Sequence, residues 1–237
     1  MSGTLVFIPG LMCDHAVWAP LLPWLDGARS WVTADHGDAD SLTTMARQVL
    51  DRTPGRLALA GHSMGGRVAL EVVRLAPERV SRVVLLDTGF LPRAPGAAGE
   101  AEAAKRHALL RVAETEGVRA MATQWVQGMV HPDRLADADL IERIVAMFAR
   151  QSAQTFARQI KALLNRPDAS AVMAAIGVPA LVLCGAQDAW STPEQHRAMV
   201  ALMAPGTPLE LIAHSGHMSP MERPEAVARA LLNWLAD

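Results

Sequence analysis

Short apolar runs that alternate with amphipathic segments are the feature of this sequence that most restricts its fold. Most of these runs are apolar throughout instead of alternating with polar residues, as strands covered on both faces require. Six of them read as strands: residues 4–10, 31–36, 57–63, 80–89, 179–188 and 208–216. Segments with helical spacing lie between or after them: residues 41–52, 64–76, 194–203 and 224–236.

This regular alternation predicts an α/β fold with a mostly parallel sheet of about six strands, flanked by helices on both faces. In sheets of this kind, ligands bind in the crevice beyond the carboxyl ends of the strands. Residues that follow strands are therefore the first candidates for a functional site.

One interval interrupts the alternation. Between about residues 91 and 176 several helical stretches follow one another without a convincing strand, after a loop at 91–99 that is rich in Pro, Gly and Ala. We therefore expect a single domain with a core formed by 1–90 and 177–237, and a helical cap formed by 91–176 after the fourth strand. The alternative is that these helices complete the core.

The composition restricts the partners of the chain. Its 237 residues, 51% of them apolar, are enough for one domain with a large buried core. A net charge of −2 provides no long-range attraction for nucleic acid or an anionic membrane, so we expect neither as a partner. Pro9 and Gly10 interrupt the first apolar stretch, which therefore predicts neither a signal peptide nor a membrane helix. Only two cysteines, Cys13 and Cys184, are present, and this favours a reducing, cytoplasmic setting.

The stretch LALAGHSMGGRVAL, residues 57–70, places a serine where a strand passes into a helix. A sharp turn there would raise the Ser63 hydroxyl at the carboxyl edge of the sheet. Such a turn leaves no room for a Cβ two residues before or after the serine, where the sequence has Gly61 and Gly65. The G-x-S-x-G pattern also arises by chance, but its position between a strand and a helix favours a nucleophilic serine.

A serine hydroxyl needs a base to accept its proton and a carboxylate to orient that base. Asp188 and His217 follow later strands, and the order Ser, Asp, His is the one expected for this topology. Asp87 also ends a strand and is the alternative acid, whereas His214 is the alternative base, disfavoured because it lies within or just past its strand. We interpret His62 as a packing or hydrogen-bonding residue beneath the turn.

Three motifs, GHSMGG, CGAQDAWSTPE and HSGHMSPMERPEAVARALLNWL, resemble the nucleophile turn, acid loop and histidine loop of the α/β-hydrolase superfamily. The resemblance covers nearly the whole chain outside the helical insertion, and it implies a serine hydrolase. One difference is that relatives commonly have two more strands before the first strand found here. The shortened sheet would have an exposed edge, and we expect either a monomer or a homodimer.

An oxyanion hole formed by two backbone N–H groups also belongs to this arrangement. One group is that of Met64, directly after the serine, and the other is that of Leu11, in the loop after the first strand. Relatives often have His-Gly in this loop, whereas this chain has Pro9 and Gly10. The change leaves the backbone donor in place.

Candidate substrate contacts are mostly large and apolar, and the alternative for each is a place in the core. Arg150, Arg158 and Lys161 could attract an acidic substrate or belong to a solvated helix face. The apolar candidates are Met12, Trp18, Trp125, Met129 and Met147.

These features together predict hydrolysis of a small carboxylic ester or related acyl compound through an acyl-Ser63 intermediate. A small-molecule substrate is expected, and neither a cofactor nor a metal, because the remaining histidines lack partners at ligand spacing. Alternatives that use the same three residues are a carbon-carbon bond hydrolase, an enol-lactonase and a lyase. The stretch Ser-Met-Gly-Gly also resembles the nucleophile turns of these enzymes. A small-molecule receptor is the alternative from a different class.

Overall fold

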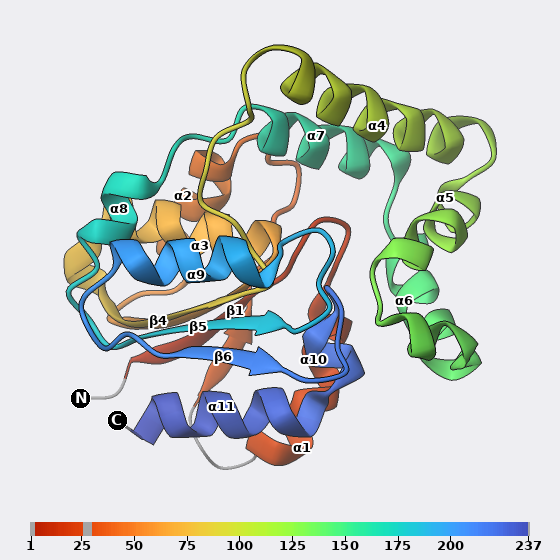
Figure 1. Ribbon diagram of the computed structural model, residues 1–237. Coiled ribbons are helices and arrows are strands. Elements are labelled where there is room, and N and C mark those ends of the chain that lie inside the picture. The colour runs from red at the N-terminus through yellow and green to blue at the C-terminus, as the bar shows by residue number, and fades with distance from the viewer. Residues whose placement is uncertain (1–2, 26–29, 237) are drawn as a thin grey trace.

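The computed structural model of the chain describes residues 3–25 and 30–236. Its strands form one sheet in which every neighbouring pair is parallel, in the order β2-β1-β3-β4-β5-β6 (Figure 1). The predicted α/β fold with a parallel sheet of about six strands is therefore confirmed. The strands are β1 (Thr4–Ile8), β2 (Trp31–Thr33), β3 (Leu57–His62), β4 (Val80–Leu86), β5 (Ala180–Gly185) and β6 (Leu209–Ile212).

Helices cover both faces of the sheet (Figure 1). One face carries α2 (Leu42–Arg52), α3 (Met64–Leu75), α8 (Ser170–Ala174) and α9 (Pro193–Leu202). The other face carries α1 (Leu22–Leu25), α10 (Ser219–Glu222) and α11 (Pro224–Ala236). Three 3₁₀ turns join these elements: η1 (His15–Val17), η2 (Ala19–Leu21) and η3 (Pro77–Arg79).

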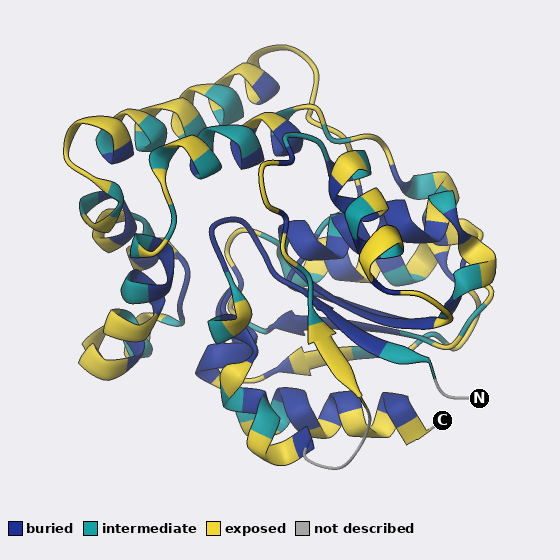
Figure 2. Ribbon diagram, turned by 180° about the vertical axis from the view of Figure 1, so that it is seen from behind, coloured by how far each residue is buried: buried dark blue, intermediate teal, exposed yellow. Residues whose placement is uncertain are grey.

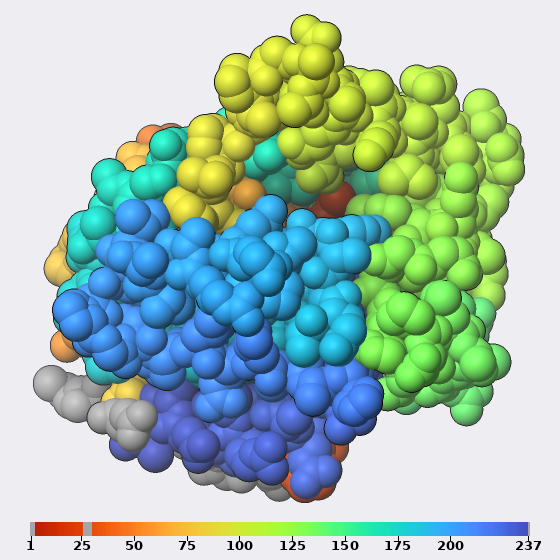
Figure 3. Space-filling model, in the orientation of Figure 1, coloured from red at the N-terminus to blue at the C-terminus, as the bar shows by residue number. Residues whose placement is uncertain are grey.

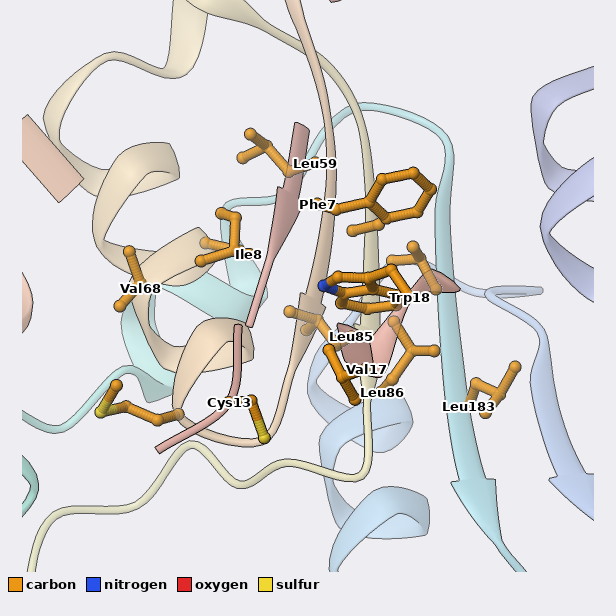
Figure 4. Packing of buried hydrophobic residues seen from close by; sticks show 14 of the residues in the cluster. Phe7, Ile8, Cys13, Val17, Trp18, Leu59, Val68, Leu85, Leu86 and Leu183 are labelled. Carbon is orange, nitrogen blue, oxygen red and sulfur yellow. The ribbon is translucent and has the colours of Figure 1, made fainter. Parts of the chain in front are cut away.

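Phe7 and Ile8 show how adjacent residues of one strand serve the two layers (Figure 4). Ile8 lies on the side of Val68 in α3, whereas Phe7 lies on the opposite side and packs against Trp18, with ring centroids 4.8 Å apart. Strand β3 is buried along its whole length, whereas the edge strand β2 is largely exposed (Figure 2). The inner strands are mostly apolar because both of their faces are covered.

Side-chain caps explain where two of the helices begin. Ser41 accepts a hydrogen bond from the N–H of Thr44 at the start of α2. Ser152 does the same for the N–H of Thr155 at the start of α7 (Ala153–Leu164). Each cap satisfies an N–H group that has no partner inside its helix.

The chain between β4 and β5 also folds into helices. Four of them stand together away from the sheet, and we call them the cap helices: α4 (Gly96–Thr115), α5 (Val118–Trp125), α6 (Ala138–Ala149) and α7 (Figures 1 and 2). The 3₁₀ turns η4 (Val126–Gly128) and η5 (Pro132–Ala136) join α5 to α6. The last helix of the interval, α8, packs against α3 and α9 instead.

None of the helices in the described part of the chain is long and apolar enough to cross a membrane.

Candidate active site

Ser63 lies on the turn between β3 and α3, and its backbone is strained. Its φ of 53° and ψ of −118° lie outside the regions that L-residues prefer. The turn is closely packed, because a Cβ on Gly65 would lie 1.9 Å from the carbonyl oxygen of Ile8. A Cβ on Gly61 would lie 2.5 Å from the carbonyl oxygen of Gly65. These contacts are the physical reason for a glycine on each side of the serine.

The structure brings Ser63, His217 and Asp188 together in one hydrogen-bonded chain. The Nε2 atom of His217 lies 2.8 Å from Ser63 Oγ, and its Nδ1 atom lies 2.8 Å from Asp188 Oδ2. The other carboxylate oxygen of Asp188 accepts hydrogen bonds from the N–H groups of Trp190 and Ser191, at 2.8 and 2.9 Å. These hydrogen bonds fix the orientation of the Asp188 carboxylate, and the carboxylate in turn orients the imidazole of His217.

Burial and charge have opposite effects on the ionisation of Asp188 and His217. Burial opposes ionisation of Asp188, but the charge and hydrogen bond of His217 outweigh it and hold the pKa of Asp188 below its ordinary value. Burial likewise disfavours the charged form of His217, yet the Asp188 carboxylate raises the pKa of His217 above its ordinary value. The geometry therefore favours a histidine that accepts a proton readily.

Asp87, the alternative acid, is fully buried nearby. Among the described residues it makes no hydrogen bond to His217, and its carboxylate accepts instead from the Gly185 N–H at 2.8 Å and from the Ser219 hydroxyl. Burial and the charge of Asp188 raise the pKa of Asp87. Asp188 is thus the carboxylate that contacts the histidine.

A possible metal-ligand group lies at the same place. One ligand atom each from Asp87, Cys184 and Asp188 lie within 4.8 Å of one another. Protein N–H and O–H groups already donate to both carboxylates, so hydrogen bonds account for their burial.

Buried polar groups that the sequence patterns did not indicate hold the loop of His217. Glu222 accepts hydrogen bonds from the N–H of Gly216 at 2.9 Å and from that of His131 at 2.7 Å. The N–H of His217 itself donates to the carbonyl of Met129 at 2.6 Å. A carboxylate directly after the mostly apolar stretch MSPM, close to the predicted base, was the signal that could have identified Glu222.

His62 and His214, the other two histidines considered near the site, have different surroundings. His62 is buried, and desolvation followed by the charge of His217 lowers its pKa to about 3. Its Nε2 atom lies 2.8 Å from the carbonyl oxygen of His217, so the neutral ring supports the histidine loop from below. His214 is exposed, and its ring lies 5.7 Å from that of His131. Among the histidines of the described residues, His217 is the one that hydrogen-bonds to the Ser63 hydroxyl.

The loop after β1 lies against the serine turn. A Cβ on Gly10 would lie 3.1 Å from the Cβ of Ser63. The N–H groups of Leu11 and Met64 have no acceptor in the described part of the chain, and both residues line the cavity above Ser63. They are therefore available to a ligand.

A cap helix holds this loop in place. The N–H of Met12, a residue with a φ of 62°, donates to the side-chain oxygen of Gln159 in α7 at 2.7 Å. On the other side of the loop, His36 Nε2 lies 3.0 Å from the carbonyl oxygen of Pro9. Gln159 is buried and comes from 147 residues further along the chain, so no local pattern could indicate this contact.

A cavity of about 620 Å³ lies over Ser63 and His217. In Figure 3 it opens as a hollow between the yellow-green cap helices and the blue part of the core. The Trp190 ring lies 5.1 Å from the His217 ring and stacks on Trp125 of the cap at 5.5 Å. The larger apolar side chains between β4 and β5 that line the cavity are Leu109, Trp125, Met129, Phe148, Phe156 and Leu163.

The expected substrate contacts divide into two groups. Trp125 and Met129 line the cavity. Met12, Trp18 and Met147 are fully buried in the hydrophobic core and do not line it, so these three expectations are corrected. Apolar character and spacing indicate burial, but they do not indicate which surface a side chain meets.

The three cap cations considered for an acidic substrate also lie away from the cavity. They pair with carboxylates on loops of the core and thereby join the cap helices to it. The pairs are Arg150 with Asp14, Arg158 with Asp38 and Lys161 with Asp40.

The chain matches the model of the alpha/beta hydrolase family over residues 5–230, and it belongs to this family. It is 28% identical over 257 residues to the biotin biosynthesis bifunctional protein BioHC of Teredinibacter turnerae, covering 98% of this chain and 44% of that protein. It is 29% identical over 233 residues to the dihydrolipoyllysine-residue acetyltransferase component of the acetoin cleaving system of Pseudomonas putida, covering 96% and 58%. The chain thus spans about half the length of these two curated relatives.

Among solved structures, the chain is similar to a thermophilic esterase from Thermogutta terrifontis that has malate bound. The TM-score is 0.86 with 25% sequence identity, and the match covers 100% of this chain and 90% of that one. The likeness extends over the cap helices as well as the sheet.

The packing of the serine turn leads to a prediction for Gly65→Ala. The added methyl group would overlap the Ile8 carbonyl, and we expect a loss of about 2 kcal/mol or more in the free energy of unfolding. Urea unfolding measures this loss. The matched control is Gly177→Ala, where nothing lies within 4 Å of the added Cβ and a change within about 0.5 kcal/mol is expected. Equal stability of the two variants would contradict the steric account.

Proposed function

We propose that this protein is a serine hydrolase that cleaves a small carboxylic ester, with Ser63 as its nucleophile. The observation that carries the proposal is the chain of 2.8 Å contacts from Ser63 through His217 to Asp188. A hydroxyl placed against an oriented imidazole is the arrangement that activates serine for acyl transfer. Membership of the alpha/beta hydrolase family and the likeness to a solved esterase support the same reaction class.

Acylation would begin with attack of Ser63 Oγ on the ester carbonyl carbon while His217 Nε2 accepts the serine proton. The N–H groups of Leu11 and Met64 would donate to the oxyanion, and loss of one such donor typically costs about 3 kcal/mol of transition-state stabilisation. The C–O bond then breaks, and His217 passes the proton to the leaving alkoxide. Asp188 would hold the imidazole with its proton on Nδ1 throughout.

Deacylation would repeat these steps with water in place of the serine. His217 would accept a proton from water, and the resulting hydroxide would attack the acyl-Ser63 carbonyl carbon. Collapse of the second oxyanion releases the carboxylic acid and returns the proton to Ser63 Oγ. The setting proposed for this reaction is the cytoplasm, which is supported by the two free, buried cysteines.

Labelling with a fluorophosphonate tests whether Ser63 is activated. We expect a covalent adduct on Ser63, located by peptide mass spectrometry, because the probe phosphonylates serines that an adjacent base deprotonates. Ser63→Ala should remove the adduct, whereas Ser170→Ala, at a surface position beside Asp168, should keep it. A folded protein that forms no adduct would contradict the hydrolase and favour the small-molecule receptor.

A substrate panel separates the ester hydrolase from reactions that use the same residues. We expect turnover of p-nitrophenyl esters, with kcat/KM falling as the acyl chain becomes too long for a cavity of about 620 Å³. A lactone and a vinylogous diketone serve as comparison substrates. Turnover confined to the diketone would replace the ester hydrolase by a carbon-carbon bond hydrolase, and turnover confined to the lactone by a lactonase.

The pH dependence of kcat/KM should follow the protonation of His217. The imidazole accepts a proton only when neutral, and the Asp188 charge outweighs burial and raises the pKa of His217 above its ordinary value. We therefore expect activity to be lost as the pH falls through a midpoint that lies above the ordinary pKa of histidine. Asp188→Asn should lower kcat by about 10⁴-fold and move the midpoint down, because the stabilising charge is removed.

A fluorogenic ester allows both profiles to be measured at low activity. Asp133→Asn, an exposed position, is the control and should leave the midpoint in place. A midpoint in Asp188→Asn equal to that of the unaltered protein would show that another carboxylate, Asp87 or Glu222, sets the pKa of His217.

A further inference from the structure

One side of the cavity is lined by cationic side chains. Arg67 comes from α3, Lys105 and Arg106 from α4, and Arg166 from the segment after α7. Among the residues that line the cavity in the described part of the chain, Glu102 is the only carboxylate. Four cationic groups therefore face one anionic group in a partly enclosed space.

Two of the four cations already share Glu102. Arg166 donates from both terminal nitrogens to the two carboxylate oxygens of Glu102, each at 2.7 Å. The Nε atom of Arg106 donates to the same carboxylate at 3.0 Å. Glu102 is therefore already paired with two guanidinium groups. The arrangement also shows that a planar carboxylate fits between guanidinium groups at this place.

Arg67 has no acidic partner among the described residues. Its Nη1 atom donates to the carbonyl of Leu91 at 2.9 Å, and Arg166 Nε donates to that same oxygen at 3.2 Å. Two guanidinium groups thus converge on one neutral acceptor. Burial, followed by the charges of Arg166 and Arg106, lowers the pKa of Arg67 to about 9. The group stays protonated at neutral pH, so an added anion would relieve this repulsion.

The position of Arg67 connects this region to the reaction. It lies near the start of α3, shortly after the serine turn, and it lines the same cavity as Ser63. A Cβ on Gly89 would lie 2.8 Å from Arg67 Nη2, so the glycine leaves room for the guanidinium beside the cavity. An anion held by Arg67 would therefore lie only a short chain away from a carbonyl placed at Ser63.

We propose that Arg67 and Lys105, flanked by Arg106 and Arg166, bind a carboxylate group of the substrate. The substrate class is then an ester that carries a second, free carboxylate a few carbon atoms from the bond that is cleaved. This inference rests on the proposed function, because it concerns the substrate of the same Ser63 site. Arginine is suited to this role because its planar fork donates two parallel hydrogen bonds to one carboxylate.

Two esters that differ only at the end of the acyl chain test the inference. Mono-p-nitrophenyl glutarate ends in a carboxylate, whereas p-nitrophenyl pentanoate ends in a methyl group at the same length. After correction for their rates of spontaneous hydrolysis in the assay buffer, we expect kcat/KM to favour the glutarate by about tenfold or more. The preference should shrink as salt is added, because the attraction is electrostatic.

Arg67→Gln should reduce the ratio of the two kcat/KM values by about tenfold or more, chiefly through KM for the glutarate. Lys105→Gln, at an exposed position, should reduce the ratio as well and serves if the first variant does not fold. The matched control is Arg119→Gln in α5, which pairs with Glu142 away from the cavity and should retain the ratio.

The outcomes separate the two proposals. Hydrolysis of both esters with a ratio near one would overturn the carboxylate site and leave the serine hydrolase in place. Equal losses for both esters in folded Arg67→Gln would assign Arg67 a structural role only, and would also overturn the inference. Absence of turnover together with absence of a fluorophosphonate adduct on Ser63 would instead reject the proposed function.

Discussion

The close approach of α3 to the ends of β1 and β3 determines where the rest of the site can lie. Gly65 touches the Ile8 carbonyl without room for a Cβ, and the resulting turn forces Ser63 to a positive φ. Hydrogen bonds to β4 and to the loop that follows it hold Ser63 in this strained conformation. Its N–H donates to Leu86 at 2.9 Å, and its carbonyl accepts from the Thr88 hydroxyl at 2.6 Å. Strain of this kind persists only where the surroundings over-determine it.

The cap helices and the segment that joins α5 to α6 take part in the geometry of the site, because they supply hydrogen bonds to both loops that frame it. Gln159 of α7 holds the N–H of Met12 beside the candidate oxyanion donors. On the other side, the Met129 carbonyl accepts from the N–H of His217, and Glu222 joins the histidine loop to the chain after η4. A movement of the cap would therefore change the position of catalytic groups as well as access to the cavity.

Local sequence patterns predicted much of the fold and the residues at the strand ends in this protein. Continuous apolar runs predicted the parallel sheet, and the strand ends pointed to Ser63, Asp188 and His217, which the structure brings into contact. This worked because parallel strands place their carboxyl ends along one edge, so that residues distant in sequence converge by topology alone. The same placement left Asp87 open as an alternative acid beside Asp188, which the resemblance to the acid loop favoured, and the hydrogen bond to His217 is made by Asp188.

The sequence by itself determined the order of the elements and the chemical groups at the strand ends, because both follow from periodicities of a few residues. Only the tertiary structure decided what each buried side chain meets. Trp18 and Met147 proved to be core residues, whereas Arg67 lines the cavity. Hydrogen bonds, cavity walls and electrostatic interactions depend on groups far apart in the chain, as in the contact of Met12 with Gln159 across 147 residues. Such pairs exist only once the sheet and the cap have closed around them.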